Sequence, residues 1–469
     1  MKLIITSNLV VVNPDDELIE KATKELTVSN PAYYLKQNCG YGVNTEPKQL
    51  ELFTHTGEVL ELPRGYDIRE AFPRFDEVDN QVTYGAPIEL TDVTIKPYSY
   101  QQEATEAFVA SQQGGVIAPC GAGKTEIAIN IINTLRTTTL ILVHTNDLRD
   151  QWLKRIKSRL GYEAGTVGGG KKVNVKDITV ATVASLYSIK GIRTYTRDSL
   201  YDKFGLVILD EAHHAPAKSW MVILAKCRAA MRLWLTATEN RRDGLGPLIP
   251  LCCGRIVYRV DHDKLLAAGR IMAPLHKAHM LNIIKGEFTR KILKSGVRQT
   301  VLDRHKLMAA VARHQDRMAY VCGQVIKDYK EGRVILILAQ GNVEMCESIF
   351  ELLLKHIPEA KPTILTGSGK YPTEQSQRAA LLDNIRNGGS RVLIATKIAE
   401  EGLDLPILDS LHLIYPSPEC EQAVGRICRT YPNKKDPIVH DYVDSDIDYL
   451  VKCFQKRCKI ITKIGGRRI

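Results

Sequence analysis

A run of small residues lies between an apolar segment that reads as a strand and a helical pattern, and it restricts this chain to few folds. The run is Ala118-Pro-Cys-Gly-Ala-Gly-Lys-Thr125. Gly121 and Gly123 would let the backbone wrap around a phosphate, and the first amides of the helix would supply positive partial charge. Lys124 would reach the β- and γ-phosphates of a nucleotide, and the Thr125 hydroxyl would bind Mg²⁺.

A second segment supplies the acidic groups that such a site needs at the end of another parallel strand. In Leu206-Val-Ile-Leu-Asp-Glu-Ala-His213, Asp210 would hold Mg²⁺ directly or through water, and Glu211 would orient or deprotonate the attacking water. A chance glycine-rich surface loop and an ordinary acidic turn are the competing interpretations. The presence of both segments, each after an apolar strand, favours a site for ATP and Mg²⁺.

Short apolar strands alternate with helical stretches in two regions of the chain. The predicted strands are Gly115–Pro119, Thr139–His144, Ile178–Thr182, Leu206–Leu209 and Leu233–Thr236 in the first, and Arg333–Ala339, Thr363–Thr366, Arg391–Ala395 and Leu411–Tyr415 in the second. This alternation predicts α/β domains, each with a parallel sheet covered on both faces. A structural duplication would explain the similar style, although the two sequences do not show one plainly.

A small α+β domain is predicted before the first of these regions. Leu3–Val12 is β-like, Asp15–Leu26 is helix-like, and Gln49–Leu62 reads as a hairpin that turns near Gly57. A polar stretch with Pro73, Gly85 and Pro87 then separates this domain from the next. We therefore expect three parts: 1–90, a small N-terminal substrate-recognition domain; 95–258, an ATP-binding lobe; and 259–469, a basic joint (about 259–313) followed by a second lobe.

The charge of the chain is unevenly distributed. Residues 1–95 carry a net charge of −8, so the other 374 residues carry +19 of the total of +11. The segment from Lys452 to Ile469 holds seven basic side chains and no acidic one. A pI of about 9.0 favours a polyanionic partner. The C-terminal segment would either contact phosphates or be only a solvated end.

The cysteines and the hydropathy pattern indicate an intracellular protein. The eleven cysteines are scattered and have no zinc-site spacing, so we interpret them as structural thiols in a reducing compartment. No apolar run approaches the length of a membrane span, and no signal-peptide pattern is present. We expect a monomer without a membrane partner in the cytoplasm.

From about residue 95 to 430 the chain resembles the superfamily 2 helicases in the order and spacing of its motifs. Tyr100-Gln101 with Glu103-Ala104 resembles the element that reads adenine, and Asp210-Glu-Ala-His213 gives the DEAH box its name. The matching segments in the first lobe are Val143–Trp152, Gly168-Gly169, Ala181–Ser185 and Thr236-Ala-Thr238. In the second lobe they are Gly367–Arg378, Ala395–Asp404 (motif V) and Gln422–Arg429 (motif VI). The resemblance implies two RecA-like parallel-sheet domains in tandem.

The resemblance also assigns roles to individual residues. It implies catalytic roles for Lys124, Asp210, Glu211, Gln422, Arg426 and Arg429, and further nucleotide contacts for Gln101, Gly121, Ala122, Gly123, Gly402 and Asp404. It implies coupling roles for His213, Thr236, Thr238, Arg241 and Asp243, and nucleic-acid contacts for His144, Thr145, Thr182, Gly367, Arg378 and Thr396. Arg426 and Arg429 would act as arginine fingers from the second lobe.

Several of these residues have structural alternatives. The two arginines could lie on a solvated helix face, His213 could be a core histidine, and Thr396, Gly402 and Asp404 could simply end a strand. Trp152 and Tyr195 could stack on bases, but packing is the favoured interpretation for both.

One detail narrows the branch of the superfamily. Thr236-Ala-Thr-Glu-Asn-Arg-Arg-Asp-Gly244 looks like the Thr-Ala-Thr…Arg-x-Asp element of the xeroderma group B DNA helicases, and the UvsW-type recombination helicases of tailed phages are also similar. Asn30-Pro31 and Pro63-Arg64-Gly65 resemble the small N-terminal domain of these relatives. Two features depart from the common pattern: Ala118 replaces a glycine, and His144-Thr145 stands where Pro-Thr is usual.

The resulting hypothesis is an ATP-dependent DNA helicase or translocase that unwinds or branch-migrates forks and Holliday junctions in recombination, repair or replication. Its partner would be branched duplex DNA with single-stranded regions. The alternatives are an RNA helicase, a DNA-translocating subunit of a restriction system and a non-hydrolytic clamp. For the acidic N-terminal domain, recognition of junction shape through contacts such as Arg64 and Arg69 competes with protein docking and with a structural cap.

Overall fold

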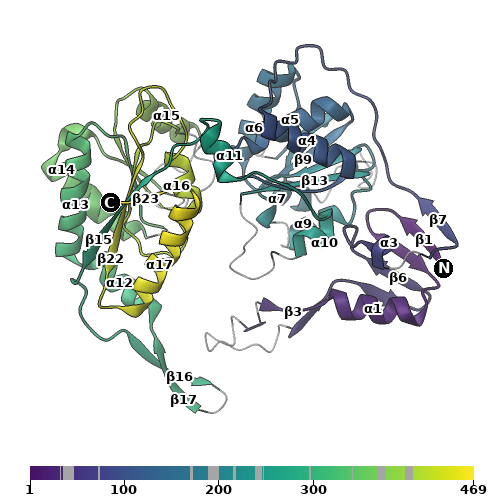
Figure 1. The fold of residues 1–469 in the computed structure, drawn as a ribbon, viewed down its shortest axis with the longest axis horizontal. Helices are drawn as coiled ribbons and strands as arrows, with labels where there is room; N and C mark the ends of the chain where they lie inside the picture. The colour runs from purple at the N-terminus through teal and green to yellow at the C-terminus, as the bar shows by residue number, and fades with distance from the viewer. Residues whose placement is uncertain are drawn as a thin grey trace. The chain divides into compact units, whose positions relative to one another are not determined.

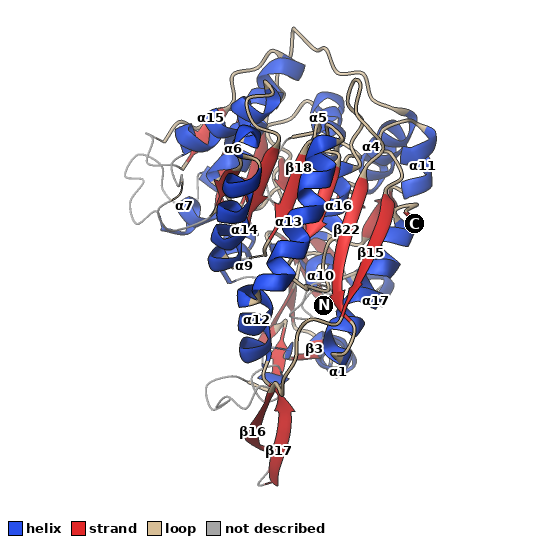
Figure 2. Ribbon diagram, turned by 90° about the vertical axis from the view of Figure 1, so that its left-hand side faces the viewer, coloured by secondary structure: helices blue, strands red, loops and turns tan. Residues whose placement is uncertain are grey.

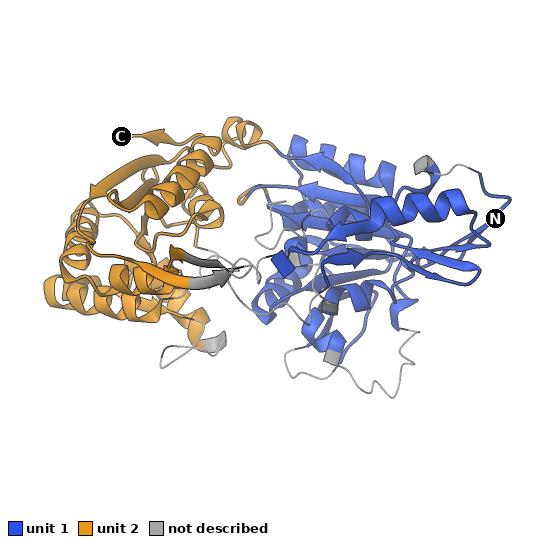
Figure 3. Ribbon diagram, turned by 90° about the horizontal axis from the view of Figure 1, so that it is seen from below, with its two compact units in different colours: residues 1–119, 123–260 blue, residues 120–122, 261–469 orange. Residues whose placement is uncertain are grey.

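The computed structural model describes residues 1–31, 33–34, 47–71, 74–168, 173–188, 200–214, 218–237, 246, 248–294, 297–340, 342–366, 371, 375–396 and 405–469 (Figure 1). Helices and strands alternate through most of this length (Figure 2). Two compact units emerge (Figure 3): unit 1 comprises Met1–Pro119 and Gly123–Val260, and unit 2 comprises Cys120–Ala122 and Asp261–Ile469.

Unit 1 begins with a five-stranded mixed sheet in the order β5-β6-β2-β1-β7. These strands are β1 (Lys2–Ile5), β2 (Leu9–Val12), β5 (Thr54–Thr56), β6 (Val59–Leu62) and β7 (Glu77–Asn80). Helix α1 (Asp16–Leu26) starts where Asp15 accepts a hydrogen bond from the Leu18 amide at 2.9 Å. Its Leu18, Ala22 and Leu26, four residues apart, are fully buried against the sheet.

The predicted hairpin over Gln49–Leu62 is only partly correct. β5 and β6 form a hairpin around Gly57, whose φ of +57° suits a glycine in the turn. β4 (Gln49–Glu51) instead pairs with β3 (Thr27–Ser29), the strand that directly follows α1. A short helix, α3 (Ile68–Ala71), completes the described part of this region.

The larger sheet of unit 1 has seven parallel strands in the order β10-β11-β9-β12-β13-β8-β14. The strands are β8 (Gln113–Ile117), β9 (Thr139–Val143), β10 (Gly165–Val167), β11 (Ile178–Thr182), β12 (Leu206–Leu209), β13 (Met231–Thr236) and β14 (Ile256–Arg259). The helices are α4 (Ser99–Ser111), α5 (Lys124–Leu135), α6 (Asn146–Leu160), α7 (Val183–Ser188), the 3₁₀ helix η1 (Ala212–His214), α9 (Lys218–Leu224) and α10 (Leu248–Cys253). α4, α5 and α6 cover one face of this sheet, and α7, α9 and α10 cover the other (Figure 1).

The stretch predicted to separate the N-terminal domain from the first lobe is bonded to that lobe along its length. The Thr83 amide donates to the Arg228 carbonyl at 2.8 Å, the Thr138 amide donates to Ala86 at 3.0 Å, and the Thr94 amide donates to Arg159 at 2.8 Å. A methyl group on Gly205 would come within 1.9 Å of the Tyr84 carbonyl oxygen, so the chain passes in direct contact with the sheet. The stretch is therefore an ordered strap.

The N-terminal sheet is joined to the same lobe by buried polar contacts. Arg232 of β13 is 2% exposed, and its guanidinium donates to the carbonyl oxygens of Ser7 at 2.8 Å and Cys227 at 2.7 Å. Close by, the Gly65 amide donates to the Leu251 carbonyl at 2.7 Å. Burial, and then the nearby Arg232, lower the pKa of Arg64 to about 10. Arg64 is half-buried beside these contacts, and its role as a DNA contact stays a prediction.

Unit 2 contains a second parallel sheet of seven strands, in the order β19-β20-β18-β21-β22-β15-β23. The strands are β15 (Leu275–Leu281), β18 (Ile335–Leu338), β19 (Thr363–Leu365), β20 (Val392–Ala395), β21 (Ser410–Leu413), β22 (Ile438–Asp444) and β23 (Arg467–Arg468). The helices are α11 (His262–Ala267), α12 (Arg304–Arg313), α13 (Gln315–Lys330), α14 (Val343–His356), the 3₁₀ helix η2 (Pro358–Ala360), α15 (Gln375–Arg386), α16 (Glu421–Ile427) and α17 (Asp448–Lys463).

The two large sheets have the same topology. When the strands of each are numbered from 1 to 7 along the chain, both have the spatial order 3-4-2-5-6-1-7. This shared order reveals the duplication that the two sequences do not show. It also corrects the prediction that 259–313 only joins the lobes, because β15 from this segment lies inside the second sheet. A hairpin of β16 (Thr289–Lys294) and β17 (Val297–Leu302) follows β15 and extends from unit 2 (Figure 1).

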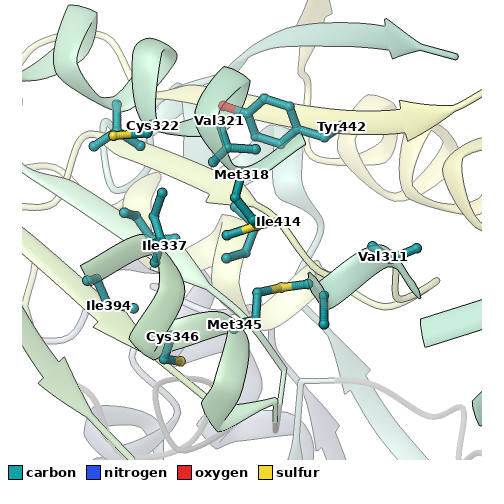
Figure 4. Packing of buried hydrophobic residues seen from close by; sticks show 14 of the residues in the cluster. Val311, Met318, Val321, Cys322, Ile337, Met345, Cys346, Ile394, Ile414 and Tyr442 are labelled. Atoms are coloured by element: carbon teal, nitrogen blue, oxygen red, sulfur yellow. The ribbon is translucent and has the colours of Figure 1, made fainter. Parts of the chain in front are cut away.

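The core of unit 2 lies between its sheet and helices α12, α13 and α14 (Figure 4). Met318, Val321 and Cys322 from α13 and Met345 and Cys346 from α14 pack against strand residues such as Ile337 and Ile394. The methionine and cysteine side chains of this set fill the irregular space between helices and sheet. The ten cysteines in the described part of the chain are all free, and eight are buried, which agrees with structural thiols.

Candidate functional site

The predicted ATP-site residues of unit 1 converge at one edge of its larger sheet. Strands β12, β13 and β8 are neighbours, and all run in the same direction. The phosphate loop follows β8, Asp210 and Glu211 follow β12, and Thr236 ends β13. Because the carboxyl ends of parallel strands meet at one edge, residues more than 100 positions apart in the chain come together there.

The loop before α5 has the backbone that a phosphate cradle requires. Gly121 and Gly123 have φ values of +91° and +76°, and helix α5 starts directly afterwards at Lys124. A methyl group on Gly123 would come within 2.7 Å of the Gln101 amide nitrogen. Gln101 is 3% exposed and accepts a hydrogen bond from the Tyr98 amide at 3.0 Å. The structure thus places the predicted adenine-reading glutamine beside the loop.

Four predicted residues form a continuous polar chain across this edge. Lys124 Nζ lies 3.3 Å from Glu211 Oε1, and His213 Nδ1 lies 3.4 Å from Glu211 Oε2. The same His213 nitrogen lies 3.4 Å from the Thr236 hydroxyl. Glu211 adopts a φ of +49°, which is uncommon for a residue with a side chain and marks the sharp turn that directs it toward Lys124. The contacts connect the phosphate loop to the end of β13.

Asp210 is held by a contact that the sequence did not reveal. The Trp152 indole N–H donates to Asp210 Oδ2 at 2.7 Å, and the Glu211 amide donates to Oδ1 at 3.0 Å. Trp152 is 1% exposed, so the prediction that it packs within the protein is confirmed and the alternative that it stacks on bases is wrong. Burial and the neighbouring Glu211 raise the pKa of Asp210, while Lys124 and Trp152 act in the opposite direction.

The electrostatics of Glu211 differ from those of its neighbour. Burial alone would raise the pKa of Glu211, but Lys124 and His213 outweigh it and hold the pKa well below its usual range. Glu211 is therefore an ionised hydrogen-bond acceptor. The Asp210 carboxylate and the half-buried Thr125 hydroxyl are oxygen donors of the kind that Mg²⁺ prefers, and Lys124 supplies a cation for phosphates. The residues therefore fit Mg²⁺ with a nucleoside triphosphate.

The predicted nucleic-acid residues of unit 1 occupy the other half of the same edge. His144 and Thr145 follow β9 and Thr182 ends β11, two adjacent strands. The Thr145 hydroxyl caps α6 by accepting from the Leu148 amide at 3.3 Å. Thr182 is 3% exposed and donates to the Ser185 hydroxyl at 2.8 Å. These two hydroxyls stabilise the local fold, so any contact with nucleic acid would involve the surrounding backbone or His144.

Unit 2 places Gln422 and Arg426 on helix α16, four residues apart, and Arg429 just after its end. Lys434, which the sequence did not single out, donates to the carbonyl oxygens of Arg429 at 2.7 Å and Pro406 at 2.8 Å. Burial lowers the pKa of Lys434 to about 8. Lys434 therefore joins the end of the predicted motif VI to the residues that follow motif V.

Of the remaining predicted residues, the structure describes only two. Thr396 is buried at the end of β20, where its amide donates to the Leu365 carbonyl at 3.2 Å, and Arg378 is half-buried on α15. The predicted residues Thr238, Arg241, Asp243, Gly367, Gly402 and Asp404 lie outside the described residues, as does Tyr195.

No helix in the described part of the chain has the length and apolar character needed to cross a membrane. Two family profiles match the chain. One is described as the res subunit of type III restriction enzymes and matches residues 94–241, and the other is described as the helicase conserved C-terminal domain and matches residues 316–431.

Two relatives extend these matches. The DNA 3′-5′ translocase XPB2 of Sulfurisphaera tokodaii is 30% identical over 364 residues, which are 72% of this chain and 80% of that protein. A protein of Acanthamoeba polyphaga mimivirus, provisionally named the ATP-dependent RNA helicase L396, is 26% identical over 476 residues, which are 97% of this chain and 82% of that protein.

The fold of this chain is supported by the first of two similar solved structures. The S. cerevisiae Dbp5 structure bound to RNA and ADP BeF3 covers 80% of this chain and 90% of that chain at 14% identity, with a TM-score of 0.55. The crystal structure of T4 UvsW covers 100% of this chain and 98% of that chain at 15% identity, with a TM-score of 0.41. Together with the two parallel sheets, the Dbp5 match confirms tandem RecA-like domains, which stand beside an N-terminal mixed sheet.

Proposed function

Because this chain belongs to the superfamily 2 DNA helicases and resembles their xeroderma group B branch, we propose that it uses ATP to unwind or branch-migrate forked and four-way DNA. The observation that carries the motor part of the proposal is the polar chain Lys124–Glu211–His213–Thr236. Helicases of this kind use ATP, usually with Mg²⁺. When bound, Mg²⁺ would neutralise phosphate charge, with Asp210 and Thr125 as its protein ligands.

We propose that the Lys124–Glu211 ion pair is exchanged during each ATPase cycle. Lys124 would leave Glu211 for the more highly charged phosphates of ATP, because its ammonium is a mobile point charge on a flexible stem. The released Glu211 carboxylate, which His213 would still contact, would orient the attacking water by accepting a hydrogen bond from it. His213 contacts both Glu211 and Thr236, so it would transmit this change toward β13.

The second lobe would complete the chemistry. We propose that Arg426 and Arg429 stabilise the charge that develops on the γ-phosphate. Gln422 would contribute to the same step, and the predicted coupling residues of the first lobe would link this step to movement. The support for these roles is the Gln-x-x-Gly-Arg-x-x-Arg pattern, which begins on α16 and ends at Arg429 just after it. Arginine fingers raise the rate of phosphoryl transfer by roughly 10³–10⁵. Gly121, Ala122, Gly123, Gln101, Gly402 and Asp404 would hold the nucleotide.

The proposed track is DNA with single-stranded regions, bound by a monomer of this chain. We propose that His144, Thr145, Thr182, Gly367, Arg378 and Thr396 mark its path. In support, His144 and Thr145 follow β9 and Thr182 ends the adjacent β11 in unit 1, and Thr396 follows β20 in unit 2. We propose that the chain is divided into the three parts 1–90, 95–258 and 259–469. We also propose roles in recombination, repair or replication, and a phage origin, because the segment Thr236–Gly244 resembles that of the UvsW-type helicases.

We propose that the N-terminal domain recognises the shape of a branch. In support, the strap and the Arg232 contacts mount this domain on the ATP-binding lobe, as a feature that reads a junction ahead of a motor would require. The net charge of −8 over residues 1–95 means that local contacts, such as the exposed Arg69, would have to act instead of bulk attraction. Protein docking is the alternative for this domain.

ATP-dependent unwinding across a panel of substrates tests the proposal. The panel contains forks, four-way junctions, and duplexes with a 3′ or a 5′ tail, all of matched length. We expect forks and four-way junctions to be processed faster than tailed duplexes, and Glu211→Gln to be inactive on all of them. Equal rates on every DNA would contradict the branched substrate but would leave the motor assignment intact.

Two alternatives have specific support. The type III restriction profile over 94–241 favours the DNA-translocating subunit of a restriction system, and the name of the mimivirus relative favours an RNA helicase. Triplex displacement without unwinding would identify the former activity. ATPase activity stimulated by RNA and not by DNA would identify the latter.

A further inference from the structure

The lysines of helix α17 face solvent, whereas the arginine of the same helix is buried. Lys452, Lys456, Lys459 and Lys463 are all exposed. Their spacing of four, three and four residues places them along one side of the helix, over a length of about 16 Å. We refer to these four residues as the α17 lysine stripe.

Arg457, on the same helix, faces the opposite way. It is 1% exposed and pairs with Asp441 of β22, with 2.7 Å between Nη2 and Oδ1. It also donates to the Ser417 carbonyl at 2.5 Å. The inward charge is thus neutralised by a dedicated carboxylate. In the described part of the chain, by contrast, no ion pair includes a lysine of the stripe.

Folding alone gives no reason for this arrangement. Like charges three or four residues apart destabilise a helix, and exposed helices usually mix both signs. The negative end of the helix dipole would favour Lys463 but not the other three lysines. No acidic residue occurs between Lys452 and Ile469. The stripe is therefore an uncompensated linear array of cations.

Carboxylates lie near both ends of the stripe. Asp448 precedes Lys452 by one helical turn, and Asp446 is already paired with Lys285 at 2.7 Å. At the other end, Asp263 and Asp261 act on His262 together with Lys463, so they lie in the same neighbourhood. Among the described residues, no ion pair joins a carboxylate to Lys456 or Lys459 in the middle of the stripe. The exposed Arg467 and Arg468 of β23 add two cations after the helix.

We propose that the α17 lysine stripe binds the phosphate backbone of DNA, as a contact surface separate from the strand-end loops that carry the helicase motifs. The inference rests on the DNA-helicase assignment but not on the preference for branches. A row of cations that extends about 16 Å fits a polyphosphate strand, which carries one charge per about 3.4 Å. Flexible lysines suit contacts that hold the backbone without reading sequence. Such a surface would hold an arm of the substrate while the motor acts on another segment.

Neutralisation of the stripe tests this proposal. The variant Lys452→Gln/Lys456→Gln/Lys459→Gln/Lys463→Gln is compared with the control Lys327→Gln/Lys330→Gln/Lys355→Gln/Lys361→Gln. The control removes the same charge from exposed lysines on and near helices α13 and α14 of the same unit. Binding to a linear duplex and to a fork is measured from 50 to 200 mM salt, together with thermal melting and basal ATPase.

We expect the stripe variant to bind both DNAs about tenfold or more weakly at low salt. The slope of log affinity against log salt should become shallower by about 0.9 for each phosphate that the variant no longer neutralises. Basal ATPase and melting temperature should match the control. Equal affinities and slopes for the two variants would overturn the proposal and would point to an acidic protein partner or to a solvated helix face. The branched-DNA proposal fails separately, if wild-type protein does not prefer the fork.

Discussion

Trp152 donates its indole N–H to Asp210, with 2.7 Å between Nε1 and Oδ2, and so joins helix α6 to the acidic end of strand β12. The hydrogen bond stabilises the charged form of a carboxylate that burial pushes toward protonation. Trp152→Phe should keep the packing and remove the bond. We expect ATP turnover at neutral pH to fall by about tenfold, since a hydrogen bond to a charged group contributes roughly 1.5–3 kcal/mol.

Trp234 provides the matched control for this substitution. It is also 1% exposed, and its indole donates one hydrogen bond, at 2.8 Å, to the Gly254 carbonyl and not to a carboxylate. Trp152→Phe should raise the pH at which activity is lost on acidification and raise the Mg²⁺ concentration needed for half-maximal rate. Trp234→Phe should change neither. Identical pH and Mg²⁺ profiles for the two variants would show that Trp152 serves packing alone.

The sequence was sufficient to predict the elements whose information is local. The phosphate loop, the Asp210–Glu211 pair and the strands around them were expected, because small residues and apolar runs at fixed offsets determine them. The partners of these residues were less accessible. Trp152 precedes Asp210 by 58 positions, so no local pattern connects the two. Lys434 was missed for the same reason, since its carbonyl partners come from two separate loops.

Strands β15 and β22 were missed because buried polar residues interrupt their apolar pattern. His276 and His279 lie in β15, and His440 and Asp441 lie in β22, all almost fully buried. Such residues are tolerated in a core only with partners, and the partners become known only from the fold. Arg457 was misread in the same way: the sequence placed it in a basic segment, but the structure pairs it with Asp441.

Glu211→Gln should abolish steady-state ATP turnover while DNA binding and folding remain. The substitution keeps the size of the side chain but removes the charge that would orient water. It also removes the ion pair with Lys124 at 3.3 Å. We expect a reduction of at least about 10²-fold in the DNA-stimulated rate. Turnover near the wild-type value, measured by phosphate release at saturating ATP and DNA, would contradict the site assignment.

Lys124→Ala serves as the companion to that variant, because it removes the other half of the same ion pair. It should lose turnover together with nucleotide affinity, since Lys124 is proposed to hold the phosphates. Glu211→Gln should retain that affinity. Binding of a fluorescent ATP analogue distinguishes the two results, and an equal loss of affinity in both variants would show that the ion pair only maintains local structure.

Arg429→Ala should separate ATP binding from hydrolysis. Arg429 is half-buried just after α16, and Lys434 holds its backbone carbonyl, so truncation of its side chain should leave the local backbone in place. We expect nucleotide binding to be retained and single-turnover hydrolysis to slow by roughly 10³-fold or more. Thr430→Ala, at the exposed neighbouring position, is the control. Unchanged single-turnover hydrolysis in Arg429→Ala would exclude the finger role.

The last prediction concerns a buried histidine network in unit 2. Asp328 of α13 accepts hydrogen bonds from His412 at 3.1 Å and from the Ser410 hydroxyl at 2.5 Å. His440 Nε2 also lies 3.1 Å from Asp328 Oδ2, and its Nδ1 is 2.9 Å from His279 Nε2. The rings of His412 and His440 are stacked at an interplanar angle of 2°. Parallel ring planes share no point where one metal ion could lie in both, so the cluster is better described as hydrogen-bonded neutral histidines around one carboxylate.

This network should make the protein sensitive to acid. Burial, followed by the effect of His412, lowers the pKa of His440 to about 4, whereas an unfolded histidine titrates near 6.5. Between pH 6.5 and 4 the unfolded chain therefore binds a proton that the folded chain does not, and stability falls as the pH falls. For His440 alone, the free energy of unfolding at pH 5 should be about 2 kcal/mol lower than at pH 7.

Urea denaturation at pH 7 and pH 5 measures this difference. His440→Gln should lower stability at pH 7 but reduce the difference between the two pH values, whereas the same change at the exposed His356 should alter neither. A pH dependence that is unchanged in His440→Gln would show that this histidine does not remain neutral in the folded state.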